Sequence, residues 1–353
     1  MVAAAGICAA VVAGALVVAN VRSPGQRVTI RPANQGAGPV PGTMFVSNLG
    51  PTNSQTGQYA GPGAVTLYPP GASGDAHPEA VITKGIDGPQ AMAVDSSGDL
   101  WVANSASSTV VEYDRAALAT ASPAPTVTIS GGAQQNIDAP YGLAFDGAGN
   151  LWVSNDAAGN FVEFAKADLV KSGAPPPEVK LTQSNPAVDG IVFDASGDLW
   201  FGDAGFIDEL SKGQLTKSGF VYPKLTIGGH GTISQSGGKS PTFDRAGDLW
   251  NGADEYNIVG EYTKAQLAEW GTGTPPVSVD NPWKVVISSA ALSSPEAVAF
   301  DRSGNLWVPN QGNNKVVEFT KAELTKSGAP APARTISGSG TGLKDCYAVA
   351  FEP

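Results

Sequence analysis

The stretch Ala144-Phe-Asp-Gly-Ala-Gly-Asn-Leu-Trp-Val-Ser-Asn155 recurs along the 353-residue chain and decides its fold. In it an apolar segment ends at Asp146, a glycine-containing turn follows, and a second apolar segment runs from Leu151 to Asn155. Two short apolar segments joined by a turn of this composition are typical of a β-hairpin. The stretch therefore predicts a hairpin, and its copies predict an all-β protein.

The turn and the second strand of this hairpin occur five times. The tryptophans of these strands lie 51, 48, 50 and 57 residues apart, by subtraction of their positions. In the second copy four strand-like segments follow one another, at residues 142–145, 151–154, 161–164 and 179–182. A repeat of this length and content predicts a four-stranded blade of a β-propeller. The copies run over Asp95–Trp101, Asp146–Trp152, Asp194–Trp200, Asp244–Trp250 and Asp301–Trp307.

The two ends of the repeated region are halves of a further copy. Residues 42–48 match the second half of the repeat, and Cys346–Phe351 match its first half. A C-terminal strand would complete the blade begun at Thr43 and remove the exposed sheet edges that promote aggregation. The sequence therefore predicts a closed, six-bladed β-propeller over residues 42–353, which we expect to be monomeric.

Short helical segments interrupt most copies between the third and fourth strands. Residues 263–266 and 320–323 read as capping boxes, and 211–214 as a weaker one. Ser-Gly-Ala-Pro follows such a segment at Ser172 and at Ser327, where we interpret it as a helix stop. These helices are predicted to lie on the outer rim of the ring.

The N-terminal segment is uncharged and apolar from Val2 to Ala19. It predicts a signal peptide cleaved after Ala19, or a membrane anchor, because its n-region carries no Lys or Arg. Residues 20–41, rich in Gly and Pro, are interpreted as a linker. We therefore expect an exported protein that is secreted, periplasmic or held at the cell surface, with membrane contact only through this segment.

Charge and cysteine content exclude several classes of function. The net charge is −11 and no Lys/Arg cluster offsets it, so nucleic-acid binding is not expected. The two cysteines, Cys8 and Cys346, rule out a disulfide framework and a cysteine-rich metal site. We interpret Cys346 as a buried, unreactive residue of a strand.

The Asp-x-x-Gly-Asn/Asp-Leu-Trp units, with the run from Pro295 to Phe300, resemble the repeats of NHL-type six-bladed propellers. More loosely they resemble the gluconolactonase/senescence-marker and virginiamycin B lyase propellers. The resemblance covers roughly residues 42 to 353 and implies the architecture. It leaves the activity open, because this scaffold hosts hydrolases, lyases and binding modules.

Two sets of polar residues are predicted to face one rim of the channel. The first set differs from copy to copy, so the repeat itself does not demand it. It consists of the residues at the start of each first strand, namely Gln90, Tyr141, Asp189, Lys239, Glu296 and Tyr347. The second set closes each second strand and comprises Asn48, Asn104, Asn155, Asp203, Asp254 and Asn310. We expect a protein, glycan or small-molecule ligand to bind here.

Carboxylate and amide oxygens that converge on an axis suit a hard cation such as Ca²⁺ or Mg²⁺. The resemblance to the gluconolactonase-like family implies a metal held by Glu296, Asn155 and Asp203, with Asn104 in reserve and Glu296 or Asp203 as the catalytic base. Two other interpretations stay open. The amides would equally serve as Asx-turns, and Lys239 between Asp189 and Glu296 would form a salt-bridged plug.

The sequence therefore predicts one function and an alternative. A binding module acting through the channel rim needs only the fold, and a divalent-metal hydrolase of the lactonase type is the alternative. Lyase chemistry of the virginiamycin type needs a histidine at the rim. His77 lies in a Pro-rich connection, and only His230, in a Gly-rich loop, would reach the rim.

Overall fold

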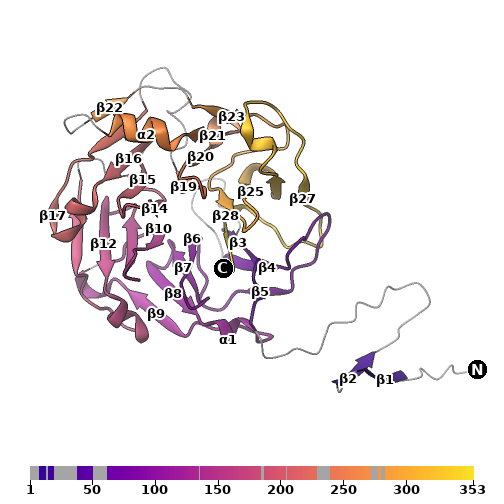
Figure 1. The fold of residues 1–353 in the computed structure, drawn as a ribbon. Helices are drawn as coiled ribbons and strands as arrows, with labels where there is room; N and C mark the ends of the chain where they lie inside the picture. The colour runs from indigo at the N-terminus through magenta and orange to yellow at the C-terminus, as the bar shows by residue number, and fades with distance from the viewer. Residues whose placement is uncertain are drawn as a thin grey trace, which may run out of the picture.

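The structure is a computed structural model in which six sheets stand around a central axis (Figure 1). This arrangement confirms the predicted all-β, six-bladed propeller. The described residues are 8–12, 15–19, 38–50, 62–134, 136–183, 187–203, 205–228, 239–271, 277–279 and 283–353, with only the backbone described for 8–12, 15–19 and 277–279.

Of the predicted signal peptide or anchor and the linker, residues 1–7, 13–14 and 20–37 lie outside the described residues. Within the predicted signal peptide or anchor, β1 (Cys8–Val12) pairs antiparallel with β2 (Ala15–Ala19). None of the helices in the described ranges is long and apolar enough to cross a bilayer. Cleavage and export stay predictions.

Each blade is an antiparallel sheet whose first strand lies at the channel. Blade 1 contains β6 (Pro89–Val94), β7 (Leu100–Asn104), β8 (Thr109–Tyr113) and β9 (Val127–Ser130). Blade 2 contains β10 (Pro140–Phe145), β11 (Leu151–Asn155), β12 (Asn160–Phe164) and β13 (Val179–Thr182). Blade 3 contains β14 (Ile191–Phe193), β15 (Leu199–Asp203), β16 (Phe206–Leu210) and β18 (Leu225–Ile227).

The remaining blades follow the same order around the ring. Blade 4 contains β19 (Thr242–Phe243), β20 (Leu249–Ala253), β21 (Ile258–Tyr262) and β23 (Val285–Ile287). Blade 5 contains β24 (Ala299–Phe300), β25 (Leu306–Asn310), β26 (Lys315–Phe319) and β27 (Arg334–Ile336). Blade 6 contains β28 (Cys346–Phe351), β3 (Met44–Asn48), β4 (Ala64–Tyr68) and β5 (Ala80–Ile82).

Blade 6 closes the ring with strands from both ends of the repeated region. β28 pairs antiparallel with β3, with Val349 opposite Val46. Two further backbone hydrogen bonds of 2.9 Å continue the pairing, from Gly42 N to Glu352 O and from Glu352 N to Thr43 O. The predicted closure by a C-terminal strand is confirmed.

The repeated tryptophan forms the contact between neighbouring blades. Each one packs on a phenylalanine of the next blade's first strand, with ring centroids 5.9–6.1 Å apart. The pairs are Trp101–Phe145, Trp152–Phe193, Trp200–Phe243, Trp250–Phe300 and Trp307–Phe351. At the sixth junction Phe45 and Val94 take these places in one buried cluster. The tryptophans are core residues, as predicted.

The repeated turn is held by its first residue. In blade 2, Asp146 Oδ1 accepts hydrogen bonds of 2.9 Å from the backbone N–H groups of Ala148 and Asn150. Gly149 has a φ of +85°, a conformation that favours glycine. Because the same arrangement recurs in the other copies, the turn aspartates are structural.

Short helices lie at the periphery of the ring (Figure 1). They are α1 (Arg115–Leu118), η2 (Lys166–Val170), η3 (Lys212–Thr216), α2 (Lys264–Trp270) and η7 (Glu323–Thr325). Other 3₁₀ turns are η1 (Gly132–Gln134), η5 (Asp254–Tyr256) and η6 (Gln311–Asn313). Rim helices were predicted between the third and fourth strands, and the structure places them there.

The Ser-Gly after a rim helix does more than stop it. Ser172 Oγ accepts a hydrogen bond from Thr128 N (3.0 Å), and Gly173 O accepts one from Ser130 N (2.9 Å). Ser327 and Gly328 bind the outer strand of blade 4 in the same way. The motif therefore joins each of these blades to the outer strand of the preceding one.

In two blades a segment from the next repeat pairs with the outer strand and forms a fifth strand. β17 (Gly219–Phe220) pairs in parallel with β13 of blade 2, and β22 (Val277–Val279) pairs in parallel with β18 of blade 3. The prediction of four strands is right for the antiparallel part of each blade. It missed these additions because they are formed by residues of the next repeat.

Candidate functional site

The first strands aim their first polar side chain with a β-bulge. The pairing register shifts at Gln90, between Pro89 and Ala91, and at Tyr141, between Pro140 and Gly142. A similar shift lies in β28, between Cys346 and Val349, and includes Tyr347. A bulge re-aims a side chain out of the strand's alternation. In these three blades the shift re-aims Gln90, Tyr141 and Tyr347, whereas no such shift occurs in the described pairings of β14, β19 and β24.

Tyrosines from two non-adjacent blades meet at this level. The Tyr141 and Tyr347 hydroxyl groups are hydrogen-bonded to each other, and the rings pack edge to face with centroids 5.8 Å apart. The Tyr347 hydroxyl also donates to Glu296 Oε2 at 3.5 Å. Leu49 and Ala297 pack with Tyr347 in a buried cluster, against which Tyr141 lies. Blades 2, 5 and 6 are thereby joined across the channel.

The predicted first ring is therefore a layer across the channel, which we call the polar layer: Gln90, Tyr141, Asp189, Lys239, Glu296 and Tyr347. Most of its members are buried, Tyr347 being 3% exposed and Asp189 7% exposed, whereas Tyr141 and Lys239 are half-buried. We predicted that these residues face one rim of the channel, where a metal site and a salt-bridged plug were both open interpretations. The burial favours the plug.

Two glycines allow the strands to approach closely below this layer. A Cβ atom at Gly190 would lie 2.3 Å from Ser240 Oγ, and one at Gly142 would lie 2.7 Å from Ser154 Oγ. The close approach lets Gly190 N donate to Lys239 O at 2.5 Å and Ser154 Oγ donate to Asp189 O at 2.6 Å. These hydrogen bonds between blades 2, 3 and 4 therefore fix the backbone positions of Asp189 and Lys239.

Carboxylates outnumber cations in the polar layer. Burial raises the pKa of Asp189 to about 7, although the Lys239 ammonium opposes the shift. Burial likewise raises the pKa of Glu296 to about 7 against the pull of Lys239. Burial disfavours the Lys239 ammonium, yet the carboxylates around it, Glu296 first, raise the pKa of Lys239. Asp254 and Asp156 also act on this ammonium, and sequence reasoning had passed over Asp156.

Lys239 makes no close ion pair with these groups. The three ion pairs within 4 Å in the described part of the chain are Arg115–Glu352, Lys224–Glu209 and Arg334–Glu318. The Lys239 charge thus acts on Asp189 and Glu296 from a longer distance. The predicted plug exists as a packed layer, but tyrosine and alanine contacts close it rather than a salt bridge.

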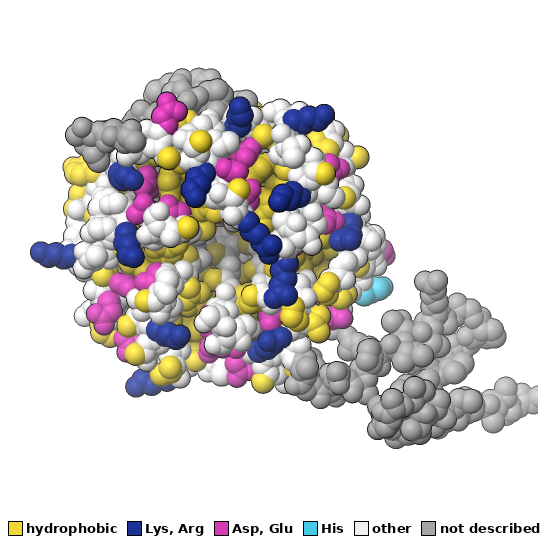
Figure 2. All heavy atoms as spheres, in the orientation of Figure 1, with side chains coloured by type: hydrophobic (Ala, Val, Ile, Leu, Met, Phe, Trp, Pro, Cys, Tyr) yellow, Lys and Arg dark blue, Asp and Glu magenta, His cyan; other side chains and the backbone are white. Residues whose placement is uncertain are grey.

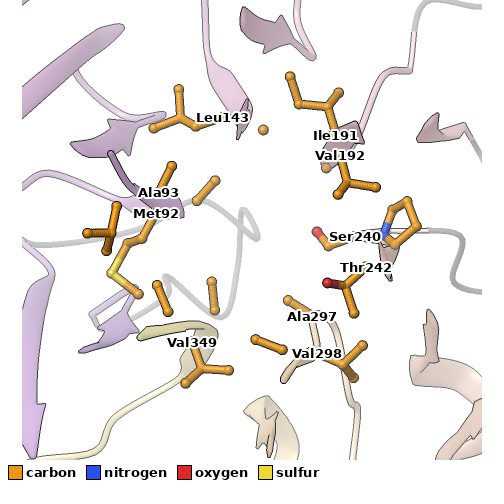
Figure 3. A pocket seen from close by; sticks show the side chains of 18 of the residues that line it. Met92, Ala93, Leu143, Ile191, Val192, Ser240, Thr242, Ala297, Val298 and Val349 are labelled. Atoms are coloured by element: carbon orange, nitrogen blue, oxygen red, sulfur yellow. The ribbon is translucent and has the colours of Figure 1, made fainter. Parts of the chain in front are cut away.

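A cavity of about 440 Å³ lies beside the polar layer and is lined by the first strands of all six blades (Figure 3). Most of the residues that line it are aliphatic, and the hydroxyl groups of Ser240 and Thr242 are among its polar side-chain groups. The space-filling view shows a hollow at the centre of the ring (Figure 2). We call this cavity the shaft.

Exposure changes along the shaft. Next to the polar layer, Leu143 is 6% exposed and Ile191 is 7% exposed. At the far end of the same strands, Val94, Val192 and Ala299 are half-buried. The shaft therefore opens away from the polar layer, which forms its inner end. Gln90 belongs to both.

The second predicted ring has a different role in four of its six members. Asn155 Oδ1 accepts from Asp138 N (2.9 Å), and its Nδ2 donates to Asn136 O (3.0 Å) and Asn160 Oδ1 (2.9 Å). The amide therefore clamps the loop that leads into the blade's first strand, instead of forming an Asx-turn with its own backbone. The same backbone N–H to amide-oxygen bond occurs at Asn48, Asn104 and Asn310.

The two aspartates of this ring, Asp203 and Asp254, have other roles than the asparagines. Asp203 Oδ2 accepts from Gln183 Nε2 at 3.1 Å. Its neighbour Asp208 is buried; burial, with the adjacent Asp203 carboxylate, raises the pKa of Asp208 to about 8. Asp254 begins η5. Sequence reasoning missed Asp208, because it lies in a third strand where the repeat otherwise places apolar or small residues.

The predicted metal set is not preassembled. The Asn155 oxygen holds Asp138 N, Asp203 lies with Asp208 and Gln183, and Glu296 lies with Tyr347. Among the described residues, only Asp95, Asp99 and Glu112 bring three acidic ligand atoms within 4.8 Å of one another, and they belong to the turn and third strand of blade 1. Glu296, Asn155 and Asp203, each held by a different partner, do not form one divalent-cation site in this arrangement, and the metal stays a prediction.

The remaining reactive residues lie away from the shaft. His77 is exposed beside Gly340 at the outside of the ring (Figure 2). His230 lies outside the described residues. Cys346 is fully buried, and burial raises the pKa of its thiol to about 12. It is therefore unreactive, as predicted.

No protein-family model matches the sequence, and no curated protein matches it. Among solved structures, a chain of the nidogen/laminin complex is 14% identical, with a TM-score of 0.56 over 88% of this chain and 99% of that one. A putative 6-phosphogluconolactonase from Bacteroides uniformis is 12% identical, with a TM-score of 0.51 over 87% and 84%. Virginiamycin B lyase from Staphylococcus aureus is 14% identical, with a TM-score of 0.48 over 82% and 83%.

These similarities confirm the predicted resemblance at the level of the fold. The first two of these structures are of a nidogen/laminin complex and of a putative 6-phosphogluconolactonase. One architecture thus carries several functions, and the function of any member depends on its own site. This chain shares the β-propeller fold of the first two of these proteins.

Proposed function

We propose that this protein is an exported propeller that binds a small ligand in its channel. The shaft carries this proposal: it is a cavity of about 440 Å³ at the centre of the ring, lined by aliphatic residues together with polar ones such as Gln90, Ser240 and Thr242. Small-molecule sites have this size and composition, with polar groups that orient the ligand. The apolar N-terminal segment supports export.

The polar layer supports binding more than catalysis. Its side chains are packed against one another and mostly buried, which suits a preorganised floor. No imidazole or thiol lies in this layer among the described residues. Protein or glycan partners would contact the outer surface of the ring, whereas a cavity of about 440 Å³ suits a small molecule.

The test is a thermal-shift screen of small molecules against wild-type protein and Ala93→Leu, which narrows the half-buried wall of the shaft. Ala167→Leu, on the exposed face of a rim helix, is the matched control. A ligand at a hundred times its Kd stabilises the folded state by about 2.7 kcal/mol. We expect hits that stabilise wild type and Ala167→Leu but not Ala93→Leu. Hits that stabilise all three proteins equally would contradict a channel site.

A lactonase-type hydrolase is the second candidate, and one observation favours it. Glu296 has a pKa of about 7, because of its burial, so it can hold or release a proton near neutral pH. We expect Glu296→Gln to abolish any lactone hydrolysis that the wild type shows, with or without added Ca²⁺. Hydrolysis that survives in Glu296→Gln, or a wild type that hydrolyses no lactone, would remove this candidate.

A further inference from the structure

We infer that this protein has a second binding site, for a small organic anion, at the junction of blades 5 and 6. The site is a cavity of about 450 Å³ whose lining includes Arg302 and Arg334. We call it the junction pocket. It lies where the first strand of blade 5 turns into the second, whereas the polar layer lies at the start of the first strands. Phe351 lines both this pocket and the shaft.

The other five blade junctions are filled by two further apolar side chains. One is a leucine of the following blade's rim helix, and the other is the first residue of the preceding blade's fourth strand. At the junction of blades 1 and 2, Leu169 and Val127 lie in one buried cluster with Trp101. The pairs at the other four junctions are Leu215 with Val179, Leu267 with Leu225, Leu324 with Val285, and Leu118 with Ala80.

Both of these side chains are replaced where blade 5 meets blade 6. The described residues 69–79, which follow the third strand of blade 6, contain no helix and contribute the small residues Ala72 and Ala76 to the cluster there. The fourth strand of blade 5 starts with Arg334 instead of an aliphatic residue. Since Ala72 and Arg334 both line the junction pocket, the pocket lies where the repeat elsewhere places two larger apolar groups.

The architecture of blade 5 does not demand Arg334. Its Nη1 lies 3.3 Å from Glu318 Oε2, and the two residues are paired across neighbouring strands. In blade 2 the equivalent glutamate, Glu163, is paired with Val179 and accepts a hydrogen bond of 2.8 Å from Asn150 Nδ2. Blade 5 has the same asparagine–glutamate hydrogen bond at 2.8 Å. A blade therefore packs without a cation at this position, so the arginine calls for another explanation.

Guanidinium donors are available in the junction pocket. Arg302 is exposed and makes no hydrogen bond or ion pair with the described residues. The Arg334 side chain is 44% exposed and contacts Glu318 only through Nη1, so the donors on Nε and Nη2 remain for a ligand. Asp301 also lines the pocket, but its two oxygens accept N–H groups of its own turn and of Trp307. The pocket thus offers unused cationic donors, and its one lining carboxylate is already hydrogen-bonded.

A small organic anion with an apolar body matches these groups. Guanidinium groups bind carboxylate and phosphate oxygens through paired, charge-assisted hydrogen bonds. Pro69, Pro70 and Met44 belong to the same lining, so an apolar body can be partly buried beside the arginines. A cationic ligand would meet repulsion from both guanidinium groups. A carboxylate and a phosphate monoester share this chemistry, and the experiment separates them.

The experiment is calorimetric titration of the wild-type protein with phenylacetate and with phenyl phosphate. Phenylacetamide and phenethylamine are the matched neutral and cationic controls, and acetate lacks the apolar body. Phenylacetate should bind at least about tenfold more tightly than phenylacetamide, because hydrogen bonds to a charged acceptor are stronger. Phenethylamine and acetate should bind more weakly than phenylacetate, and the Kd of phenylacetate should rise with salt concentration. The tighter of the two anions identifies the acidic group that the pocket prefers.

Variants test the two arginines separately. Arg302→Gln should weaken phenylacetate binding about tenfold. Arg245→Gln is its matched control, because Arg245 holds the same place in the turn of blade 4, at a junction that apolar side chains fill. Arg334→Val introduces the residue that blade 2 has at this position and should also weaken binding at least about tenfold, with a denaturation midpoint that confirms folding. Ala93→Leu, in the shaft, should leave phenylacetate binding unchanged.

Phenylacetamide binding as tightly as phenylacetate, or equal losses of affinity in Arg302→Gln and Arg245→Gln, would overturn the inference. So would titrations in which neither anion binds the wild-type protein at millimolar concentration. Phenylacetate binding that is lost in Ala93→Leu but kept in Arg302→Gln and Arg334→Val would place the anion in the shaft and leave the junction pocket without a ligand.

Discussion

The blade junctions and the polar layer follow opposite rules. At five junctions a tryptophan packs on a phenylalanine with almost the same geometry each time. At the axis, the first strands begin at equivalent places but present side chains of five different types at their six positions. Residues that repeat are explained by the architecture. Residues that differ, and that contact other blades across the channel, are where a function specific to this chain can be sought.

The largest effect should come from removing the strand on which every junction depends. Deletion of residues 344–353 removes β28, opens the ring and exposes the edge of β3. We expect aggregated or protease-labile protein, measured by size-exclusion chromatography and limited proteolysis. Removal of Pro353 alone is the control. A monomeric deletion variant with an unchanged Tm would contradict closure by β28.

Disruption of a single blade junction should destabilise the protein less than opening of the ring, but more than substitution of any residue of the polar layer. Trp152→Ala removes a side chain that is 2% exposed and packs on Phe193, so we expect a loss of about 3–5 kcal/mol in the free energy of unfolding. Chemical denaturation measures it. Phe220→Ala, at an aromatic that is 54% exposed, is the control and should cost less than about 0.5 kcal/mol.

Loss of the Asn155 side chain, which holds the loop before the first strand of its blade, should destabilise the protein less than loss of a junction tryptophan. Asn155→Ala leaves Asp138 N and Asn136 O without their partner, at a cost of about 1–3 kcal/mol. Because this side chain serves its own blade, we expect any channel ligand to bind Asn155→Ala as it binds wild type. A variant that keeps its stability but loses a metal or a ligand would instead assign Asn155 to the site.

The smallest effect should be the pH dependence contributed by the polar layer. Folding raises the pKa of Asp189 and Glu296 to about 7, because burial favours their protonated forms. The folded state therefore binds more protons than the unfolded state between about pH 4 and 7, and stability falls as pH rises through that window. The double variant Asp189→Asn/Glu296→Gln should show a flatter fall in denaturation midpoints from pH 5 to 8. An unchanged slope would mean that these carboxyls titrate as if exposed.

The sequence was enough to identify many residues of the candidate site, but not to say how those residues pack against one another. Counting from the repeated turn was enough to find Gln90, Tyr141 and Glu296. Whether they formed an open rim or a closed layer depended on β-bulges and on the meeting of Tyr141 with Tyr347, residues 206 positions apart. No local pattern encodes such a contact. The role of the asparagines that end the second strands could not be predicted either, because their hydrogen-bond partners lie in the loop before the first strand.

The sequence by itself determined the blade, the number of blades and the closure of the ring. It did so because an aspartate-glycine turn, a core tryptophan and a half-copy at each end act through neighbours a few residues away or through a repeated partner. Only the tertiary structure decided which polar residues meet at the axis, that they lie beside a central cavity, and that Ser172 and Ser327 join neighbouring blades. Those features arise from contacts between different repeats, where side-chain size, bulges and burial act together.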